Sequence, residues 1–158
     1  MKYLTLFIIL LNSFSQGQSD EIVTIDSLLN NWHYSAEVSD KLTYFNLLDE
    51  NCIFLGTDKT ERWSKNEFIK WSEPYFNRES AWVIKPLRRN IYLSEDNSFA
   101  WFDEDLNAGI GECRGSGVLI LSDGSWRLIQ YNLSLTIPND IAVSVKKLVD
   151  EYNKTLEK

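Results

Sequence analysis

Three side chains, His33, Asp103 and Arg114, are the best candidates for chemistry in this sequence. His33 is the single histidine of the chain, and a histidine can act as a base or a hydrogen-bond donor near neutral pH. Asp103 follows Trp101 at the spacing that puts both on one face of a strand, and an aromatic wall can raise the pKa of a carboxyl group. Arg114 is a natural partner for that carboxylate. These residues predict proton transfer by His33 and Asp103, assisted by the positive charge of Arg114.

Each candidate also has a purely structural interpretation. His33 comes one helical turn after Leu29, where a histidine can simply satisfy its hydrogen bonds between helix and sheet. Asp103 and Glu104 are consecutive residues of an expected strand, so their side chains point to opposite sides and only one can face a pocket. Both carboxylates could instead pair with basic side chains at the rim of the sheet. The sequence leaves the catalytic and the structural interpretations open.

Five further side chains are predicted to contact a bound molecule: Trp63, Trp101, Gln130, Asn132 and Ser134. The two tryptophans could line a pocket for a flat or apolar ligand, although core packing explains tryptophans equally well. The three uncharged polar residues suit the orientation of a ligand better than proton transfer, or else they satisfy the mouth of a barrel. With one histidine and no Cys-x-x-Cys spacing, we expect no metal site and no cofactor.

A predicted hairpin positions these polar residues. Asp123-Gly124 suits a two-residue turn with positive φ angles, which would pair Ser122 with Ser125 and fix the register of both strands. On that register Gln130, Asn132 and Ser134 share a face with glycines of the preceding strand. Because glycines have no side chain, they leave space opposite these polar residues. This face is therefore predicted to line the mouth of a pocket.

The opposite face of the same hairpin is predicted to be apolar, without a helix to cover it. Its apolar members would be Val118, Ile120, Ile129, Tyr131, Leu133 and Leu135. Because an uncovered apolar sheet face is usually an interface, we expect a homodimer through this convex face.

Helical periodicity supplies the other elements. Apolar residues recur at helical spacing over residues 25–36 and 42–48, and Ser64-Lys-Asn-Glu67 has the capping-box spacing of a further helix. A short β-prone segment, residues 52–55, lies between them. After Pro138 an apolar stripe predicts a C-terminal helix.

Several short motifs in this order of elements resemble those of a known family. They are Trp32-His33, Phe54-x-Gly56-Thr-Asp58, Glu61-x-Trp63, Trp101-Phe-Asp-Glu104, Arg114-Gly-x-Gly-Val118 and Gly124-x-Trp126-x-Leu-Ile-x-x-x-Leu133-Ser134. Over roughly residues 22–139 the chain resembles the SnoaL-like, or nuclear transport factor 2-like, domain family. The resemblance implies an α+β cone in which a strongly bent antiparallel sheet packs on N-terminal helices and encloses a pocket. Asn132 stands where the family often has a histidine.

The resemblance does not determine a function, because members of this family include isomerases, polyketide cyclases, dehydratases, an epoxide hydrolase and proteins without known activity. We favour a pocket that binds a small, partly apolar molecule without transforming it, since acid-base groups are scarce. The alternative is a cofactor-independent isomerase, cyclase or hydrolase that uses His33 and Asp103. A third possibility is an interaction domain that works through the exposed sheet face.

The N-terminus predicts export. A basic start, a short apolar run and a small-residue exit over residues 1–17 form the pattern of a secretory signal peptide, with cleavage after Ser15 or Gly17. The apolar run falls short of the roughly 20 residues of a membrane span, so we expect no stable membrane anchor. We therefore expect a signal peptide at 1–17, a SnoaL-like domain at 22–139 and a C-terminal helix at 140–158. The protein is expected to be periplasmic or extracellular.

The net charge limits the possible partners, and the two cysteines allow one disulfide. Without residues 1–17, fifteen basic side chains face 23 acidic ones. That negative field repels phosphate backbones, so we expect no nucleic-acid partner. Cys52 and Cys113 could form a disulfide in an exported protein or remain buried free thiols.

Overall fold

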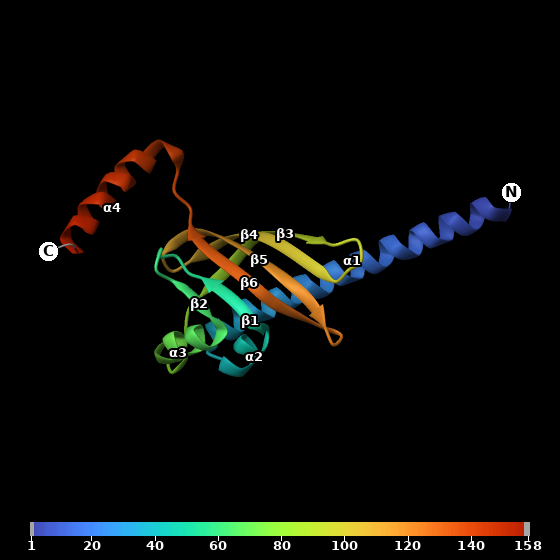
Figure 1. Cartoon of the computed structure of the whole chain (residues 1–158), viewed down its shortest axis with the longest axis horizontal. Helices are drawn as coiled ribbons and strands as arrows, with labels where there is room; N and C mark the ends of the chain where they lie inside the picture. The colour runs from blue at the N-terminus through green and yellow to red at the C-terminus, as the bar shows by residue number, and fades with distance from the viewer. Residues whose placement is uncertain (1, 157–158) are drawn as a thin grey trace.

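The computed structural model has an α+β arrangement and describes residues 2–156, with side chains from Ser19 onward. The elements are α1 (Lys2–Glu37), α2 (Lys41–Asn46), β1 (Leu48–Leu55), β2 (Arg62–Ser64), α3 (Lys65–Phe76), β3 (Ile84–Leu93), β4 (Phe99–Ala108), β5 (Gly111–Ser122), β6 (Ser125–Leu135), the 3₁₀ turn η1 (Asn139–Ile141) and α4 (Ala142–Leu156) (Figure 1).

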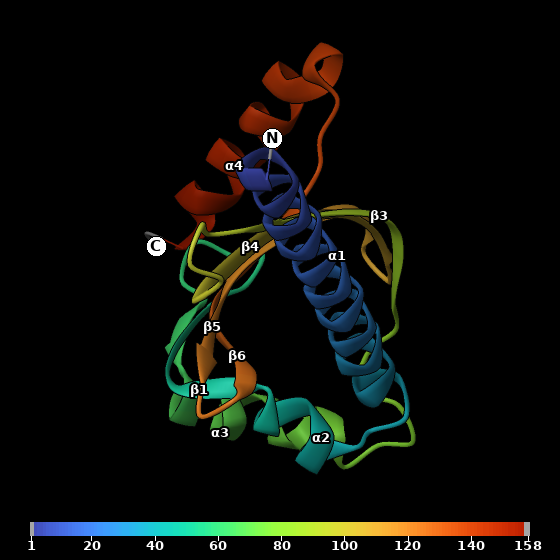
Figure 2. The ribbon, with the colours of Figure 1, turned by 90° about the vertical axis from the view of Figure 1, so that its right-hand side faces the viewer.

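The six strands form one curved, unclosed sheet in the order β2-β1-β6-β5-β4-β3. The sheet bends around α1, and α2 and α3 lie at one end of it (Figure 2). Neighbouring strands are antiparallel except for β1 and β6, which run parallel. The predicted α+β cone with N-terminal helices and a C-terminal helix is therefore confirmed, although its sheet is mixed rather than wholly antiparallel.

The turn between β5 and β6 is the two-residue hairpin that the sequence predicts. Asp123 and Gly124 have φ angles of 51° and 72°, and Ser122 pairs with Ser125. Gly124 adopts this left-handed conformation without a steric cost, and aspartate tolerates it better than most residues.

A β-bulge interrupts this register four pairs from the turn. Leu119 pairs with Leu128, but Val118 pairs with Gln130, so Ile129 is an extra residue on β6. An inserted residue shifts the alternation of side chains by one position, and every later side chain of that strand changes face.

The bulge corrects the predicted faces of β6. Tyr131 and Leu133 point to the helix side of the sheet, whereas Gln130, Asn132 and Ser134 point to the outer side. The prediction that these three polar residues share the pocket face with glycines of β5 is therefore wrong. For the same reason Tyr131 and Leu133, which were expected on the outer face, lie inside, whereas Leu135 is 46% exposed.

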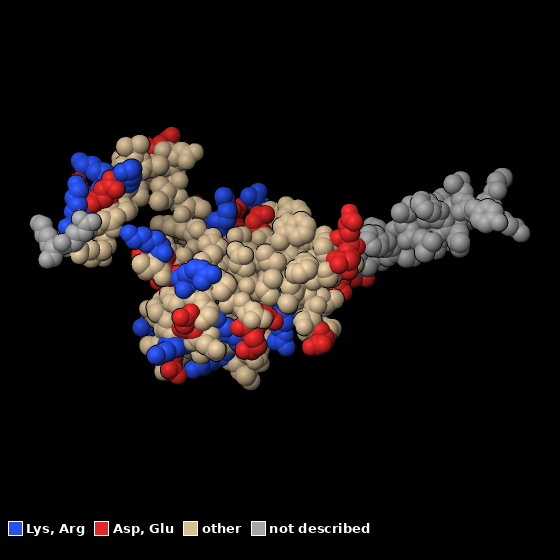
Figure 3. All heavy atoms as spheres, in the orientation of Figure 1, with Lys and Arg blue, Asp and Glu red and all other residues tan. Residues whose placement is uncertain are grey.

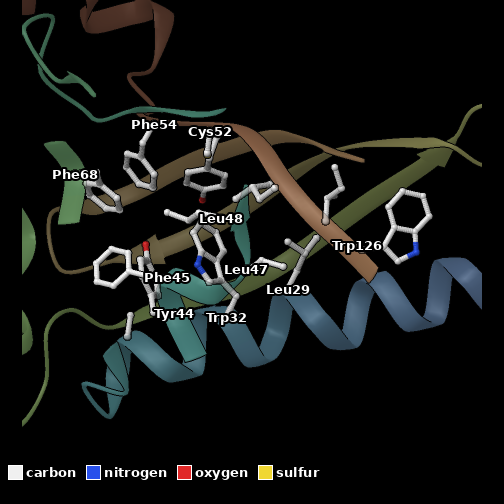
Figure 4. Packing of buried hydrophobic residues seen from close by; sticks show 14 of the residues in the cluster. Leu29, Trp32, Tyr44, Phe45, Leu47, Leu48, Cys52, Phe54, Phe68 and Trp126 are labelled. Atoms are coloured by element: carbon white, nitrogen blue, oxygen red, sulfur yellow. The ribbon is translucent and has the colours of Figure 1, made fainter. Parts of the chain in front are cut away.

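The core lies between α1 and the inner face of the sheet. Ile25, Leu29, Trp32 and Ala36 recur along one side of α1 and are at most 2% exposed, as their spacing predicts. Figure 4 shows Leu29 and Trp32 pointing from α1 toward the aromatic side chains of the core.

The two cysteines are free thiols, buried in separate clusters of the core. Burial raises the pKa of the Cys52 thiol to about 12 and also raises the pKa of Cys113. Of the two alternatives that the sequence left open, the structure therefore has the free thiols.

α3 is fixed at both ends of its first turn by the expected capping box. The Ser64 side chain accepts from the Glu67 backbone N–H, and the Glu67 carboxylate accepts from the Ser64 backbone. Phe68, four residues after the Ser64 cap, stacks on Phe54 of β1 with ring centroids 3.8 Å apart. This contact holds α3 against the end of the sheet.

The C-terminal helix α4 extends away from the sheet (Figure 1). None of its residues is buried, although it has the predicted apolar stripe. It begins after the η1 turn instead of directly at an Asn139 cap.

No helix among the residues with described side chains is long and apolar enough to cross a bilayer. The side chains of the predicted signal peptide, residues 1–17, lie outside the described ones.

Candidate functional site

An aromatic pocket of about 320 Å³ opens at the end of the cone where α3 lies. It is bounded by the ends of β1 and β4, the start of β3 and the inner face of β6. Eight aromatic side chains contribute to its wall: Trp32, Tyr44, Phe54, Trp63, Phe68, Trp71, Trp82 and Tyr131. Trp63, one of the residues predicted to contact a ligand, is part of this wall.

The rings of this wall contact one another, which fixes their positions. Trp63 lies 4.5 Å from Trp71 between ring centroids, and Trp32 lies 5.0 Å from Tyr44 and 4.8 Å from Tyr131. Offset and edge-to-face contacts of this kind add to the free energy of burial. The pocket is therefore lined by mutually supported rings.

Polar groups are few in the pocket. Glu61 is the one charged residue among the described residues that line it, and Thr57 is at the same edge. Trp32 is buried, and its indole N–H has no hydrogen-bond partner among the residues described. Tyr131 also lines the pocket, and its hydroxyl group donates to Glu104.

Behind Tyr131 lies a buried ionic network centred on Glu104, whose side chain is fully buried. His33 Nε2 lies 2.9 Å from Glu104 Oε1, and the Tyr131 hydroxyl donates to the same oxygen at 3.0 Å. Arg89 Nε donates to Glu104 Oε2 at 2.9 Å, and Arg89 Nη2 lies 2.7 Å from the same oxygen. Both oxygens of the carboxylate are thus engaged.

These partners keep Glu104 ionised. Burial raises the pKa of Glu104, but the hydrogen bond from His33 and the positive charges of His33 and Arg89 outweigh it and hold the pKa below its usual value. The pKa of Tyr131 is raised well above its usual value by burial and by the nearby Glu104 charge. Tyr131 therefore remains a protonated donor.

Arg89 also ties the network to α1. Its Nη1 atom donates to Asp26 Oδ1 at 2.7 Å and to Asn30 Oδ1 at 2.9 Å. Gly115 leaves the space that the network needs, because a Cβ atom there would lie 2.5 Å from the Tyr131 hydroxyl and 2.7 Å from Glu104 Oε1. The network therefore links α1 with β3, β4 and β6.

The structure does not bring the predicted catalytic residues together. His33 is inside the cone, but Asp103 is on the outer face, where Asn90 Nδ2 donates to its Oδ2 at 2.9 Å. Arg114 is also outside and largely exposed, 3.6 Å from Asp105. The prediction that Asp103 faces the pocket is wrong. The carboxylate that meets His33 belongs to its neighbour Glu104.

Four of the five predicted ligand contacts also lie away from the pocket. Trp101 is 47% exposed on the outer face and stacks on Tyr92 at 5.7 Å. Asn132 Nδ2 donates to Ser134 Oγ at 3.1 Å, and Gln130 is exposed on the same face. Neither these residues nor the Glu104 network lines the pocket, apart from Tyr131.

Sequence reasoning missed Glu104, Arg89 and Tyr131. A signal for Glu104 existed, since it alternates with Phe102 and Leu106, two apolar residues that must face the core. Tyr131 could not be placed without knowledge of the bulge. Among residues 19–156, no group of three or more acidic, histidine or cysteine side chains is arranged to hold a metal ion.

Comparisons with known proteins agree with this architecture. The model of a family described as a SnoaL-like domain matches residues 25–138, which confirms the resemblance stated above. No curated protein matches the sequence.

Solved structures with the same fold are distant in sequence. A nuclear transport factor 2-like protein of unknown function from Pseudomonas putida has a TM-score of 0.66 at 11% identity, covering 77% of this chain and 91% of that one. A proposed scytalone dehydratase from Novosphingobium aromaticivorans has a TM-score of 0.65 at 12% identity, covering 78% and 89%. A proposed ketosteroid isomerase from Parabacteroides distasonis has a TM-score of 0.58 at 14% identity, covering 72% and 86%.

Proposed function

The chain belongs to the SnoaL-like family, and from that premise we propose that its pocket binds a small, partly apolar molecule without transforming it. The aromatic wall carries this proposal. Ligand sites are concave, mostly apolar and have volumes from about 300 Å³ upward. At about 320 Å³ the pocket suits a compact molecule with one or two rings.

The unpartnered indole N–H of Trp32 supports a ligand with a polar group. A buried donor without an acceptor is costly, so buried donors normally have a partner in the protein, in ordered water or in a ligand. An apolar molecule that carries one hydrogen-bond acceptor would meet both the aromatic wall and this donor.

Binding without catalysis is favoured because the histidine–carboxylate pair of the cone lies outside the pocket, which leaves Glu61 as the one charged side chain among the described lining residues. His33 and Glu104 contact each other, and neither lines the pocket. A general base must reach the proton that it removes, directly or through one water. Since Asp103 is outside the cone, the alternative of an enzyme that uses His33 with Asp103 has no geometric support.

The test compares two tryptophans in the full chain. Intrinsic fluorescence and thermal shift are measured with a panel of small aromatic compounds and the dye ANS. Trp63→Ala removes part of the pocket wall and should weaken binding at least tenfold. Trp101→Ala removes the same side chain from the outer face and should leave binding unchanged. Equal affinities of the two variants, or no binding to the wild type, would refute the proposal.

Homodimer formation through the convex sheet face is a second part of the proposal. Tyr92, Phe99 and Trp101 are each 46–47% exposed there. In Figure 3 few charged side chains lie over β5 and β6. Exposed apolar patches of this kind mark interfaces. Sedimentation at micromolar concentration should give a dimer that Trp101→Asp converts to a monomer. A monomeric wild type would remove this part.

Export is the third part, and it rests on the sequence of residues 1–17. Expression of the full chain in a bacterial host, followed by fractionation and N-terminal sequencing, should yield periplasmic or secreted protein that starts after Ser15 or Gly17. Cytoplasmic protein with an intact N-terminus would contradict export and leave the binding proposal untouched.

A further inference from the structure

We propose that the ligand of the aromatic pocket is an organic cation, a substituted ammonium group on an apolar body, with its charge next to Glu61. This inference rests on the proposed binding function and adds the chemical class of the ligand.

The charge of the pocket lining is one-sided. Glu61 lines it, and none of the described lining residues is a lysine, arginine or histidine. No basic side chain described in the structure lies within ion-pair distance of Glu61. Arg62, the next residue, is exposed and pairs with Leu55 across the β1–β2 strands. The pocket therefore has one negative charge that the protein does not neutralise locally.

The buried network behind Tyr131 does not supply the missing positive charge. There Arg89 contacts both Glu104 and Asp26, and His33 contacts Glu104 as well. These groups neutralise one another within the network. Since none of the described lining residues is basic, a positive charge next to the partly exposed Glu61 carboxylate would come from a bound ligand.

Glu61 is held in position by its loop. Its Oε2 atom accepts from the Asp58 backbone N–H at 3.1 Å, and the Gly56 N–H donates to the Glu61 carbonyl at 2.9 Å. A Cβ atom at position 56 would lie 2.2 Å from Glu61 Oε2, so the glycine leaves the space in which the carboxylate lies. A carboxylate fixed in this way costs less entropy to engage than a free surface side chain.

The neighbouring rings suit the same ligand. Trp63 follows Glu61 by two residues and lies near Trp71, and both line the pocket. The faces of aromatic rings, tryptophan above all, attract ammonium groups through their quadrupole. A carboxylate beside tryptophans therefore binds a substituted ammonium by charge and its alkyl groups by apolar contact.

Glu61 also disfavours other ligands. An anion is repelled, and a neutral molecule that covers the carboxylate removes water from it without replacing the lost interaction. The carboxylate thus selects for a cation among molecules of equal shape.

The test uses two molecules of the same shape, phenyltrimethylammonium and tert-butylbenzene. Their affinities for the full chain are measured by tryptophan fluorescence and calorimetry. We expect the ammonium ligand to bind at least tenfold more tightly. Glu61→Gln keeps an acceptor for Asp58 and should remove most of this preference while leaving tert-butylbenzene unaffected. Glu79→Gln removes the same charge from an exposed site outside the pocket lining and should change neither affinity.

Three other outcomes would overturn the cation inference. Equal affinity of the two molecules for the wild type, or tighter binding of tert-butylbenzene, overturns the cation inference and leaves the pocket as a binding site. Equal weakening of both ligands by Glu61→Gln also overturns it, because Glu61 would then only shape the loop. If neither molecule nor any member of the wider panel binds, both the inference and the proposed function fail.

Discussion

The two faces of β4 carry neighbouring carboxylates with opposite environments. Glu104 points inward, is fully buried and contacts His33, Arg89 and Tyr131. Asp103 points outward, remains partly exposed and accepts one hydrogen bond from a neighbouring strand. A buried charge depends on its partners because water cannot replace them, whereas an exposed charge is screened. One residue of displacement along the strand therefore changes a surface acid into the centre of the core's ionic network.

Tryptophans show the same division between faces. Trp63 forms part of the aromatic wall of the pocket, whereas Trp101 stacks on one tyrosine in contact with solvent. Only the inner position can surround a small molecule. The outer position can contribute to binding only by meeting another surface, which is why we propose a ligand on the inner face and a dimer contact on the outer one.

The largest contrast is expected between Glu104→Ala and Asp103→Ala. The first leaves Arg89 buried without its main partner and should lower the free energy of unfolding by about 3–5 kcal/mol. The second should cost less than about 1 kcal/mol. Urea unfolding followed by fluorescence measures both.

A double variant sharpens this contrast. Replacing Glu104 and Arg89 together by leucine should recover much of the stability lost in Glu104→Ala, because the Arg89 charge is then no longer buried without its partner. If the free energy of unfolding of Glu104→Ala lies within about 1 kcal/mol of the wild-type value, the buried network does not determine the stability of the fold.

The next effect concerns the space behind the network. Gly115→Ala places a methyl group against the Tyr131 hydroxyl and Glu104, which must shift, and should cost about 1–3 kcal/mol. Gly109→Ala is the control, since a Cβ atom there has nothing within 4 Å. Chemical denaturation of the two variants should separate them; similar values would mean that the network adapts freely.

A pH dependence of smaller size follows from the lowered pKa of Glu104. A carboxyl group whose pKa is lower in the folded state gives stability that is complete above its unfolded pKa, about 4.3. This stability is lost as the pH falls through the folded value. The stability gap between wild type and Glu104→Gln should therefore be largest near pH 7 and narrow below about pH 4. A gap that stays constant from pH 7 to pH 3 would contradict the assignment.

The elements and their order could be predicted from the sequence because each has a local cause. The Asp123-Gly124 turn, the Ser64–Glu67 capping box and the apolar stripe of α1 all appear where their residues require. Fold class follows from such signals because they are repeated along the chain.

The site could not be predicted to the same degree, because it depends on single-residue alternation between faces. One extra residue, Ile129, moves Tyr131 inside and Asn132 outside. For β4, Trp101 suggested the wrong face, since a tryptophan is assumed to be buried although this one is exposed. The alternation of Phe102 and Glu104 was the better guide, but a buried glutamate makes sense only once Arg89 is known to lie opposite.

The smallest expected effect belongs to Arg114, which the sequence had proposed as the positive charge of a catalytic site. It is largely exposed, and its guanidinium lies 3.6 Å from Asp105, a distance and exposure at which ion pairs contribute less than about 1 kcal/mol. Arg114→Ala should therefore leave both stability and ligand affinity near wild-type values, whereas Arg89→Ala should cost several kcal/mol because Glu104 loses its cation. Unfolding and ligand titration of this pair compare the same side chain on the two faces of the sheet. A strong loss of affinity in Arg114→Ala alone would move the binding site to the outer face and reverse the comparison.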